Sequence, residues 1–253
     1  MNPVIVKNVK IGEGIPKICV TIVGTTKDEI IDEAKKILAL SADLVEWRAD
    51  WYEDVFDLEQ VKEVLEELGK ILKEKPLLFT FRTAREGGER AIDHITYIGL
   101  NKVAVESGKV DLVDVELFSG EAVVENLIDI AHRNHVKVIA SNHDFAKTPS
   151  KEEMISRLQK MQEMGADVLK IAVMPKTAKD VITLLSATQE MSTNYAKQPI
   201  VTMSMSGQGV ISRISGEIFG SAITFGTAGK ASAPGQMAVQ DLSGILGILH
   251  KAQ

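Results

Sequence analysis

The sequence has a single cysteine, Cys19, among its 253 residues. An intrachain disulfide is therefore impossible, and the apolar string around Cys19 is typical of a buried strand, where cysteine behaves as a small hydrophobe. The first residues carry no signal-peptide pattern, and no apolar run approaches the roughly 18 residues of a membrane span. We expect a reduced, cytoplasmic protein with no membrane partner.

Basic residues are not in excess either. The 29 lysines and arginines are outnumbered by 35 aspartates and glutamates, which gives a net charge of −6. Proteins that bind nucleic acids normally have a basic face, so we expect no nucleic-acid partner. A few arginines in a pocket could still bind a small anion, because local charge can act against the net charge.

Motifs for metals and organic cofactors are also missing. The chain has no HxxxH or CxxC spacing, no facial triad of ligands and no GxGxxG string. Such motifs hold zinc or cradle the pyrophosphate of a dinucleotide. We expect chemistry that side chains carry alone, with no metal and no cofactor.

What the sequence does contain is a regular alternation of two patterns. Short apolar runs rich in β-branched residues start 22 to 35 residues apart, which is the length of a βα unit. Their unbroken apolar character is typical of parallel strands covered on both faces. The eight predicted strands are Ile18–Val23, Leu44–Trp47, Leu77–Phe81, Leu112–Val115, Val136–Ala140, Val168–Val173, Ile200–Met205 and Ala222–Phe225.

Amphipathic stretches with apolar residues at three-to-four spacing lie between these runs and predict helices. They are Lys27–Leu40, Leu58–Leu72, His94–Glu106, Ala122–Asn134, Lys151–Met164, Thr177–Met191, a shorter one at Val210–Ile218, and Gln236–Leu249. Eight βα units without a flexible linker predict one α/β domain over residues 1–253, folded as a (β/α)₈ TIM barrel. Two short apolar runs flanking Lys7 and Asn8 predict a β-hairpin within residues 1–14 that closes the bottom of the barrel.

Lys170 is the most informative single residue, because it lies inside an apolar strand between Leu169 and Ile171. Lysine is rarely buried without a partner, and a desolvated lysine near other cations can be a neutral nucleophile. Two structural interpretations stay open: an ion pair with Glu116, or a lysine that reaches solvent from the strand edge. Charged residues at several neighbouring strand ends favour a functional role, since barrel enzymes build their sites there.

His143 follows the fifth predicted strand and is the candidate acid–base group, because imidazole both takes and gives a proton near neutral pH. Glu86 and Glu116, at other strand ends, could orient it and fix its tautomer. The four remaining histidines fall in helical or helix-end stretches and are interpreted as surface residues.

Arg48, Arg82 and Arg213 are candidates for an anion clamp, because the planar guanidinium binds carboxylates with two parallel hydrogen bonds. Glu46 could hold one guanidinium or a substrate hydroxyl. Structural ion pairs with nearby acids are the alternative, and they could account for one or two of the three arginines.

Residues 226–236 follow the eighth predicted strand and contain three glycines. With Ser232 and Gln236 as hydrogen-bonding groups, the segment could be a lid over the substrate. A merely flexible loop and a phosphate cup are the alternatives. Gln236 is placed at the start of the last helix.

Eight strings of the sequence, in order over almost the whole chain, resemble type I 3-dehydroquinate dehydratase. They are Glu-Trp-Arg (46–48), Leu-Phe-Thr-Phe-Arg-Thr (78–83) with Glu-Gly-Gly-Glu (86–89), Ser-Asn-His-Asp-Phe (141–145), Lys-Ile-Ala-Val-Met-Pro (170–175), Met-Ser-Met (203–205), Gly-Val-Ile-Ser-Arg (209–213), Phe-Gly-Ser-Ala (219–222) and Ser-Ala-Pro-Gly-Gln (232–236). The resemblance implies dehydration of 3-dehydroquinate to 3-dehydroshikimate in the shikimate route, without metal or cofactor, by an enzyme that is commonly a homodimer.

The resemblance also implies roles for individual residues. Lys170 would form an imine with the substrate ketone, His143 would shuttle protons and Glu86 would support His143. The residues implied to bind the substrate are Thr21, Glu46, Arg48, Arg82, Arg213, Ser232 and Gln236. Thr21 stands where the family has serine, and it keeps the hydroxyl.

Two other functions are compatible with the residues alone. An aldolase or transaldolase would share the Schiff-base lysine but cleave a carbon–carbon bond. A catalytically silent barrel would use the arginines only to bind a carboxylate, and it would not need a nucleophilic Lys170.

Overall fold

The computed structural model describes residues 2–253 and is a parallel β-barrel wrapped in helices. The barrel strands are β3 (Lys17–Ile22), β4 (Leu44–Arg48), β5 (Leu77–Thr80), β6 (Leu112–Glu116), β7 (Lys137–Asp144), β8 (Val168–Val173), β9 (Ile200–Ser204) and β10 (Ile223–Thr227). They pair in sequence order, and β10 also pairs in parallel with β3. The predicted TIM barrel is therefore confirmed.

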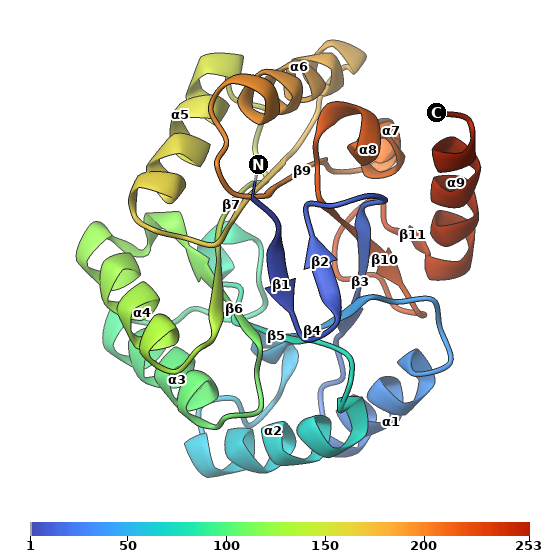
Figure 1. Cartoon of the computed structure of the whole chain (residues 1–253). Helices are drawn as coiled ribbons and strands as arrows, with labels where there is room; N and C mark the ends of the chain where they lie inside the picture. The colour runs from blue at the N-terminus through green and yellow to red at the C-terminus, as the bar shows by residue number, and fades with distance from the viewer. Residues whose placement is uncertain (1) are drawn as a thin grey trace.

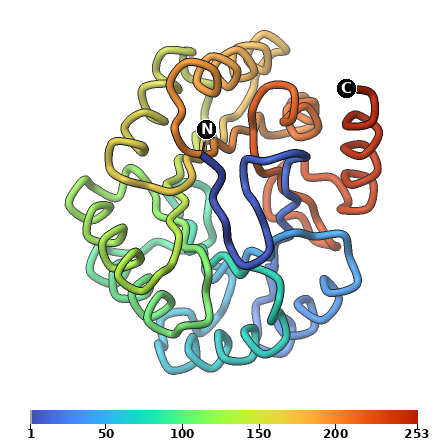
Figure 2. The backbone as a smooth tube through the Cα atoms, viewed as in Figure 1, coloured from blue at the N-terminus to red at the C-terminus, as the bar shows by residue number. Residues whose placement is uncertain are grey.

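The barrel closes between β9 and β10 through a narrow seam. An isolated bridge joins Ile200 to Ser221, and the Ala222 amide donates to the Ile200 carbonyl at 2.7 Å. The Ser221 hydroxyl adds a hydrogen bond from the Thr202 amide at 3.0 Å. The tube in Figure 2 accordingly runs once around the axis, from blue to red.

The helices lie outside the strands and cover them (Figure 1). They are α1 (Lys27–Ile37), α2 (Leu58–Leu72), α3 (His94–Glu106), α4 (Glu121–Arg133), α5 (Lys151–Glu163), α6 (Ala178–Asn194), α7 (Val210–Ile214), α8 (Gly216–Phe219) and α9 (Val239–Lys251). Short 3₁₀ turns η1 (Ala49–Trp51), η2 (Ala84–Glu86), η3 (Leu117–Ser119) and η4 (Gly207–Gly209) follow four of the strands. Within residues 2–253, none of the helices has both the length and the apolar character needed to cross a bilayer.

Local sequence explains where several helices begin. Thr26 caps α1 in a capping box with Glu29, and the Ser150 hydroxyl accepts from the Glu153 amide at the head of α5. Both patterns satisfy amide groups that a helix start leaves without partners.

The core has two layers, separated by the strands. The outer layer packs strand residues such as Val45 and Leu169 against the apolar faces of the helices. The inner layer fills the barrel with residues near the strand starts, including Cys19, Leu44 and Val201. Cys19 is buried with a free thiol, as predicted.

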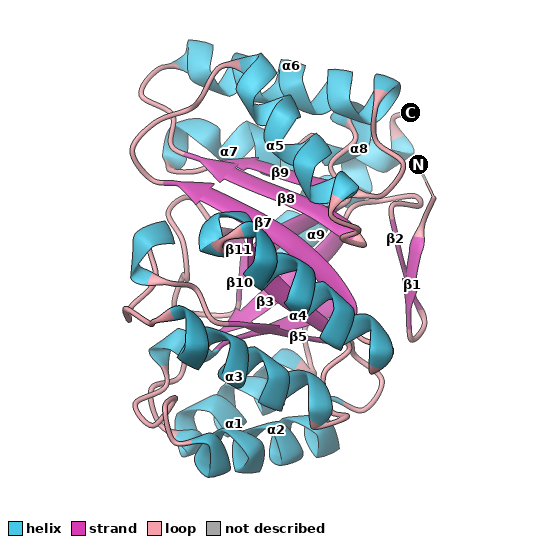
Figure 3. Ribbon diagram, turned by 90° about the vertical axis from the view of Figure 1, so that its left-hand side faces the viewer, coloured by secondary structure: helices cyan, strands magenta, loops and turns pink. Residues whose placement is uncertain are grey.

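The N-terminal hairpin consists of β1 (Val4–Val6) and β2 (Val9–Ile11), which turn at residues 7 and 8. Val6 and Ile11 belong to the inner core layer, so the hairpin closes the end of the barrel where the strands start. Figure 3 shows the strand arrowheads pointing away from this hairpin. The predicted hairpin is confirmed, and the mouth of the barrel lies at the opposite end.

Several predicted boundaries were wrong by a few residues, and three of them have a clear structural reason. The last helix begins at Val239, not at Gln236, because Met237–Ala238 forms a short strand, β11, paired with Gly226 and Thr227 of β10. The stretch over residues 210–218 divides into α7 and α8. β7 continues through Asp144, four residues beyond its apolar part, because β8 pairs with its backbone over that length.

Candidate active site

Lys170 lies in the middle of β8, and its side chain is buried inside the barrel mouth. Its Nζ is 3.3 Å from Asp114 Oδ2, 3.8 Å from Glu46 Oε1 and 4.4 Å from the centre of the Phe225 ring. The structure therefore pairs Lys170 with Asp114, not with Glu116. The charged groups nearest to the amine are the carboxylates of Asp114 and Glu46.

His143 lies near the end of β7, and Glu86 in η2 holds it in two ways. Glu86 Oε2 accepts from the His143 backbone amide at 2.8 Å and lies 3.2 Å from Nδ1 of the ring. With Nδ1 facing Glu86, Nε2 is the ring nitrogen left for a substrate. Glu116, the other candidate for this role, instead accepts from the Thr83 amide and hydroxyl.

The surroundings of His143 and Glu86 shift their two pKa values in opposite directions. Burial, together with the positive charges of Arg82, Lys170 and Arg48, holds the pKa of His143 well below its ordinary value of 6.5. The ring is therefore neutral at pH 7 and able to accept a proton. Burial raises the pKa of Glu86 from 4.5 to about 7, so small changes around this carboxyl alter its charge near neutral pH.

Glu46, in β4, is fixed by two hydroxyl groups. Thr21 donates to Oε2 at 3.1 Å, and Thr80 donates to Oε1 at 2.9 Å. Glu46 lines the mouth cavity, whereas Thr21 is not among its lining residues. Thr21 thus supports Glu46 from behind, and the serine-like hydroxyl matters for holding this carboxylate.

Two of the three candidate arginines are already paired. Arg48 makes two hydrogen bonds with Asp50, at 2.7 and 2.8 Å. Arg82 bonds to Asp114 at 2.9 Å and to Glu116 at 2.8 Å. Although burial opposes its charge, these acids raise the pKa of Arg82. The structural interpretation thus holds for these two side chains, although both also line the mouth cavity.

Arg213, in α7, differs from them. It is 2% exposed, yet within residues 2–253 no carboxylate lies within 4 Å of its guanidinium. Nη2 donates to the Pro234 carbonyl at 3.0 Å, and Nε is buried without a partner. Burial lowers the pKa of Arg213 to about 10, so it is still a cation at pH 7. A buried, uncompensated guanidinium is a site for a carboxylate.

Residues 226–236 cover the mouth. Gln236 bonds to Ser232 twice, from the Ser232 amide to Oε1 and from Nε2 to the hydroxyl, both at 2.9 Å. Beneath this segment the mouth cavity measures about 40 Å³. One water needs about 10–15 Å³, so a substrate with a six-membered ring enters only if the cover moves.

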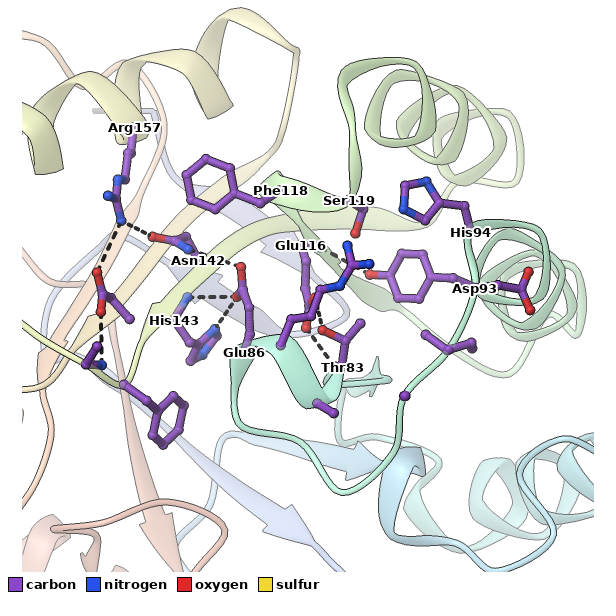
Figure 4. Close-up of a pocket in the computed structure, with 18 residues that line it drawn as sticks. Thr83, Glu86, Asp93, His94, Glu116, Phe118, Ser119, Asn142, His143 and Arg157 are labelled. Carbon is purple, nitrogen blue, oxygen red and sulfur yellow. Dashed lines mark hydrogen bonds and ion pairs between the residues drawn. The ribbon is translucent and has the colours of Figure 1, made fainter.

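A second cavity of about 490 Å³ adjoins the mouth beside the ends of β5, β6 and β7. Figure 4 shows its lining, with Glu86 and His143 on the wall that it shares with the mouth. Asn142 and Arg157 line the same cavity and lie next to Glu86.

The mouth cavity brings together most of the predicted site residues. Its lining includes Lys170, His143, Glu86, Glu46, Arg48, Arg82, Ser232 and Gln236. Arg213 and Thr21 are not among these lining residues: Arg213 contacts Pro234 of the cover and Met203 of the cavity wall, and Thr21 contacts Glu46. In residues 2–253, no three His, Cys, Asp or Glu side chains gather in a way that could hold a metal ion.

Sequence reasoning did not assign roles to several residues of the site. Asp114 and Thr80 contact catalytic candidates directly, and Phe225, Met203 and Met205 supply apolar walls. Asp114 carried a detectable signal, since an acid inside an apolar strand two residues before Glu116 must point to the same side of the sheet. The apolar walls carried none, because such residues are ordinary strand residues.

Comparison with known proteins agrees with this geometry. The family model of type I 3-dehydroquinase matches residues 18–253. The chain is 58% identical to 3-dehydroquinate dehydratase of Listeria innocua over 251 residues, with 99% of each chain covered. It is 58% identical to the Clostridium botulinum enzyme of the same name over 246 residues, with 97% of each covered.

Solved structures give the same result. A crystal structure of type I 3-dehydroquinate dehydratase from Clostridium difficile, with covalently modified comenic acid, superposes with a TM-score of 0.97 at 55% identity, covering 99% of both chains. A 3-hexulose-6-phosphate synthase superposes with a TM-score of 0.61 at 15% identity, and this likeness concerns the fold alone.

Proposed function

Because the chain belongs to the type I 3-dehydroquinase family, we propose that it eliminates water through a Schiff base on Lys170. Members of this family are hydro-lyases, and the chain is accordingly a 3-dehydroquinate dehydratase of the shikimate pathway. The observation that carries the proposal is the single cavity in which a buried amine, a neutral imidazole and paired arginines meet. Family membership decides against the aldolase, transaldolase and silent-barrel alternatives.

The arginines are proposed to bind the carboxylate of the substrate. The substrate is a carboxylate, and Arg213 is the buried guanidinium without an acid of its own among residues 2–253. Arg48 and Arg82 are preorganised by Asp50 and Asp114, so they offer their remaining N–H groups in fixed directions. Glu46, Ser232 and Gln236 supply acceptors and donors for the hydroxyl groups.

The covalent steps start at the amine. Asp114 Oδ2, at 3.3 Å, accepts a hydrogen bond from Lys170 Nζ and orients the amine, which attacks in its neutral form. The amine adds to the C3 carbonyl, and loss of one water gives a protonated imine. This imine is an electron sink, so the adjacent C2 proton becomes more acidic than in the ketone.

His143 then moves the protons. Its neutral ring takes the C2 proton, which gives an enamine and an imidazolium. The imidazolium returns a proton to the C1 hydroxyl, which leaves as water from the same face. Addition of water to the conjugated imine releases the product ketone and frees Lys170. General acid–base catalysis of this kind typically contributes about 10²–10⁴-fold.

A trapping experiment tests the covalent step. Borohydride added during turnover of 3-dehydroquinate should reduce the imine to a stable secondary amine on Lys170, located by mass spectrometry of peptides. Lys170→Met should give neither adduct nor turnover. An adduct on another lysine, or turnover without any adduct, would contradict the Schiff-base route.

Three further expectations stay predictions: a single domain, a homodimer and a cytoplasmic location. The lid function of residues 226–236 is part of the proposal, and it is tested separately below.

A further inference from the structure

Two side chains that the mechanism does not use connect α5 to the acid–base dyad. Asn142, in β7, is 2% exposed, and its Nδ2 donates to Glu86 Oε1 at 3.1 Å. Arg157, in α5, donates from Nη1 to Asn142 Oδ1 at 2.8 Å. Figure 4 shows the resulting row from Arg157 through Asn142 and Glu86 to His143.

The chemistry of the guanidinium fixes the direction of this row. Arginine has five N–H donors and no acceptor, so the Asn142 group that faces it must be the carbonyl oxygen. The amide NH₂ group then has to face Glu86. With the amide turned over, a carbonyl oxygen would face a carboxylate, and neither could donate. Arg157 therefore ensures that Glu86 receives a hydrogen bond.

Arg157 is itself held in place, which makes it a suitable anchor. Its Nε donates to Glu153 at 2.9 Å, Asp144 lies 3.9 Å from Nη1, and its guanidinium lies 5.3 Å from the centre of the Phe118 ring.

We propose that Asn142 and Arg157 are positioning residues of the dehydration: they keep Glu86 ionised and in the place where it orients His143. The proposal rests on the proposed function, in which His143 moves the protons. Neither side chain contacts Lys170, and neither is expected to touch the substrate.

The charges around Glu86 explain why one neutral donor matters. Arg82, two residues after β5, lies 3.7 Å from Glu86 and lowers its pKa, whereas Glu116, in β6, raises it. His143 of β7 is the other close contact of Glu86. Lys170 of β8 and Arg48 of β4 act on His143 from the other side. Burial raises the pKa of Glu86 to about 7, and the Asn142 hydrogen bond is one of the groups that lower it.

The sign of the effect follows from this balance. Removing the Asn142 donor raises the pKa of Glu86 further, so the carboxyl becomes neutral at a higher pH. A protonated Glu86 is a weaker acceptor for Nδ1–H of His143, and turnover should be lost on the acid side. The acid limb of the kcat profile should therefore move to higher pH.

The test measures kcat and KM for 3-dehydroquinate between about pH 5 and 9, where the pH profile reports the essential groups. A hydrogen bond to a charged group corresponds to roughly a tenfold effect, so Asn142→Ala should lower kcat near pH 7 about tenfold and shift the acid limb upward by about one unit. KM should change less than about twofold, as for a residue that does not bind substrate.

Arg157 provides a matched pair. Arg157→Met should shift the acid limb in the same direction but less, because Asn142 can then turn. Arg157→Lys keeps a donor near Oδ1 and should stay close to the unmodified enzyme. Glu153→Ala removes the outer partner of Arg157 while leaving the Asn142 contact, and it should leave the profile unchanged.

The outcomes separate the two proposals. An acid limb that Asn142→Ala leaves in place, with activity lost equally at every pH, would overturn the positioning role. If Arg157→Met does not fold, as thermal unfolding would reveal, Asn142→Ala alone decides. An unmodified enzyme that does not dehydrate 3-dehydroquinate would refute the proposed function instead.

Discussion

At the scale of single residues, two buried carboxyls in the mouth of the barrel have very different pKa values. Asp114 is fully buried and would on that ground be hard to ionise, but Arg82, Lys170 and the Ser141 hydroxyl hold its pKa below the ordinary value. Glu86 has less compensation, and its pKa is raised to about 7. Asp114 thus stays ionised near neutral pH, whereas Glu86 titrates there, and a carboxyl with such a raised pKa is typical of sites that move protons.

The raised pKa of Glu86 predicts a pH-dependent cost in stability. A group whose pKa is higher in the folded protein favours folding below its ordinary pKa of 4.5, and this contribution is lost as the pH rises through about 7. Glu86→Gln removes that charge. Near pH 8 it should raise the free energy of unfolding by about 1–3 kcal/mol, while turnover falls.

Urea unfolding near pH 8 and near pH 5 checks this expectation. The advantage of Glu86→Gln should shrink at the lower pH, where the carboxyl of the unmodified protein is already protonated. Glu163→Gln, at the end of α5, serves as the control outside the site. An advantage of the same size at both pH values would show that it comes from packing, not from charge.

The sequence was informative about which residues meet and less so about how they pair. Lys170 and His143 could be identified because a buried lysine and a histidine after a strand are chemically exceptional. The partner of Lys170 could not be identified from the sequence. Asp114 and Glu116 are two residues apart on β6 and point to the same side. The stagger between barrel strands, which no local pattern encodes, decides which of them the lysine meets.

At the scale of elements, the cover formed by residues 226–236 is held mainly through its backbone. The Ser232 carbonyl accepts from Arg48 at 3.5 Å and the Pro234 carbonyl from Arg213 at 3.0 Å. The Lys230 ammonium lies 4.0 Å from the centre of the Trp51 ring. The same arginines that are proposed to bind substrate also hold the cover, so substrate binding and closure share two side chains.

Gly235 gives a direct test of closure. Its φ is +79°, and a Cβ placed there would lie 2.3 Å from the Ser206 carbonyl oxygen. Gly235→Ala should prevent the cover from packing against Ser206. The left-handed backbone costs a further 1–2 kcal/mol or so, and KM should rise roughly tenfold or more. Trypsin should cleave faster after Lys230.

Gly229→Ala is the matched control in the same segment, because nothing lies within 4 Å of its Cβ position. Its KM and its rate of cleavage should stay close to those of the unmodified enzyme. Equal effects of the two substitutions would mean that general stiffness of the segment, not its seat on Ser206, controls binding.

Element boundaries were predictable where they depend on local patterns. The periodicity of α2 and α3 gave both helices with their bounds as observed. It failed at Gln236, whose side chain folds back onto Ser232 while the next two residues pair with β10. That pairing depends on the exposed edge of another strand, and the helical pattern after it gives no sign of it.

At the scale of the whole molecule, the hairpin fills the end of the barrel opposite to the site. Ile11 is fully buried in the inner core layer, whereas Ile5, on the same hairpin, is 59% exposed. Ile11→Ala should lower the free energy of unfolding by about 2–4 kcal/mol, as for other large-to-small core changes. Ile5→Ala should change it by less than about 0.5 kcal/mol.

Denaturant unfolding of both variants checks this, with kcat near pH 7 as the second measurement. Turnover of folded Ile11→Ala should be close to that of the unmodified enzyme, because the site is at the other end of the strands. Equal losses of stability in the two variants would argue that the hairpin does not seal the core.

The regular spacing of eight βα units was enough to predict the barrel. The place of its narrow seam was not predictable, because the Ile200–Ser221 bridge joins β9 to the start of β10, and no local pattern encodes that pairing.

The hairpin also bears on how the protein is made. Val6 and Ile11 precede all of their core partners along the chain, and those partners extend from Cys19 to Phe225. During synthesis this apolar face therefore leaves the ribosome before the residues that cover it. The barrel bottom can be sealed only after β10 has been made.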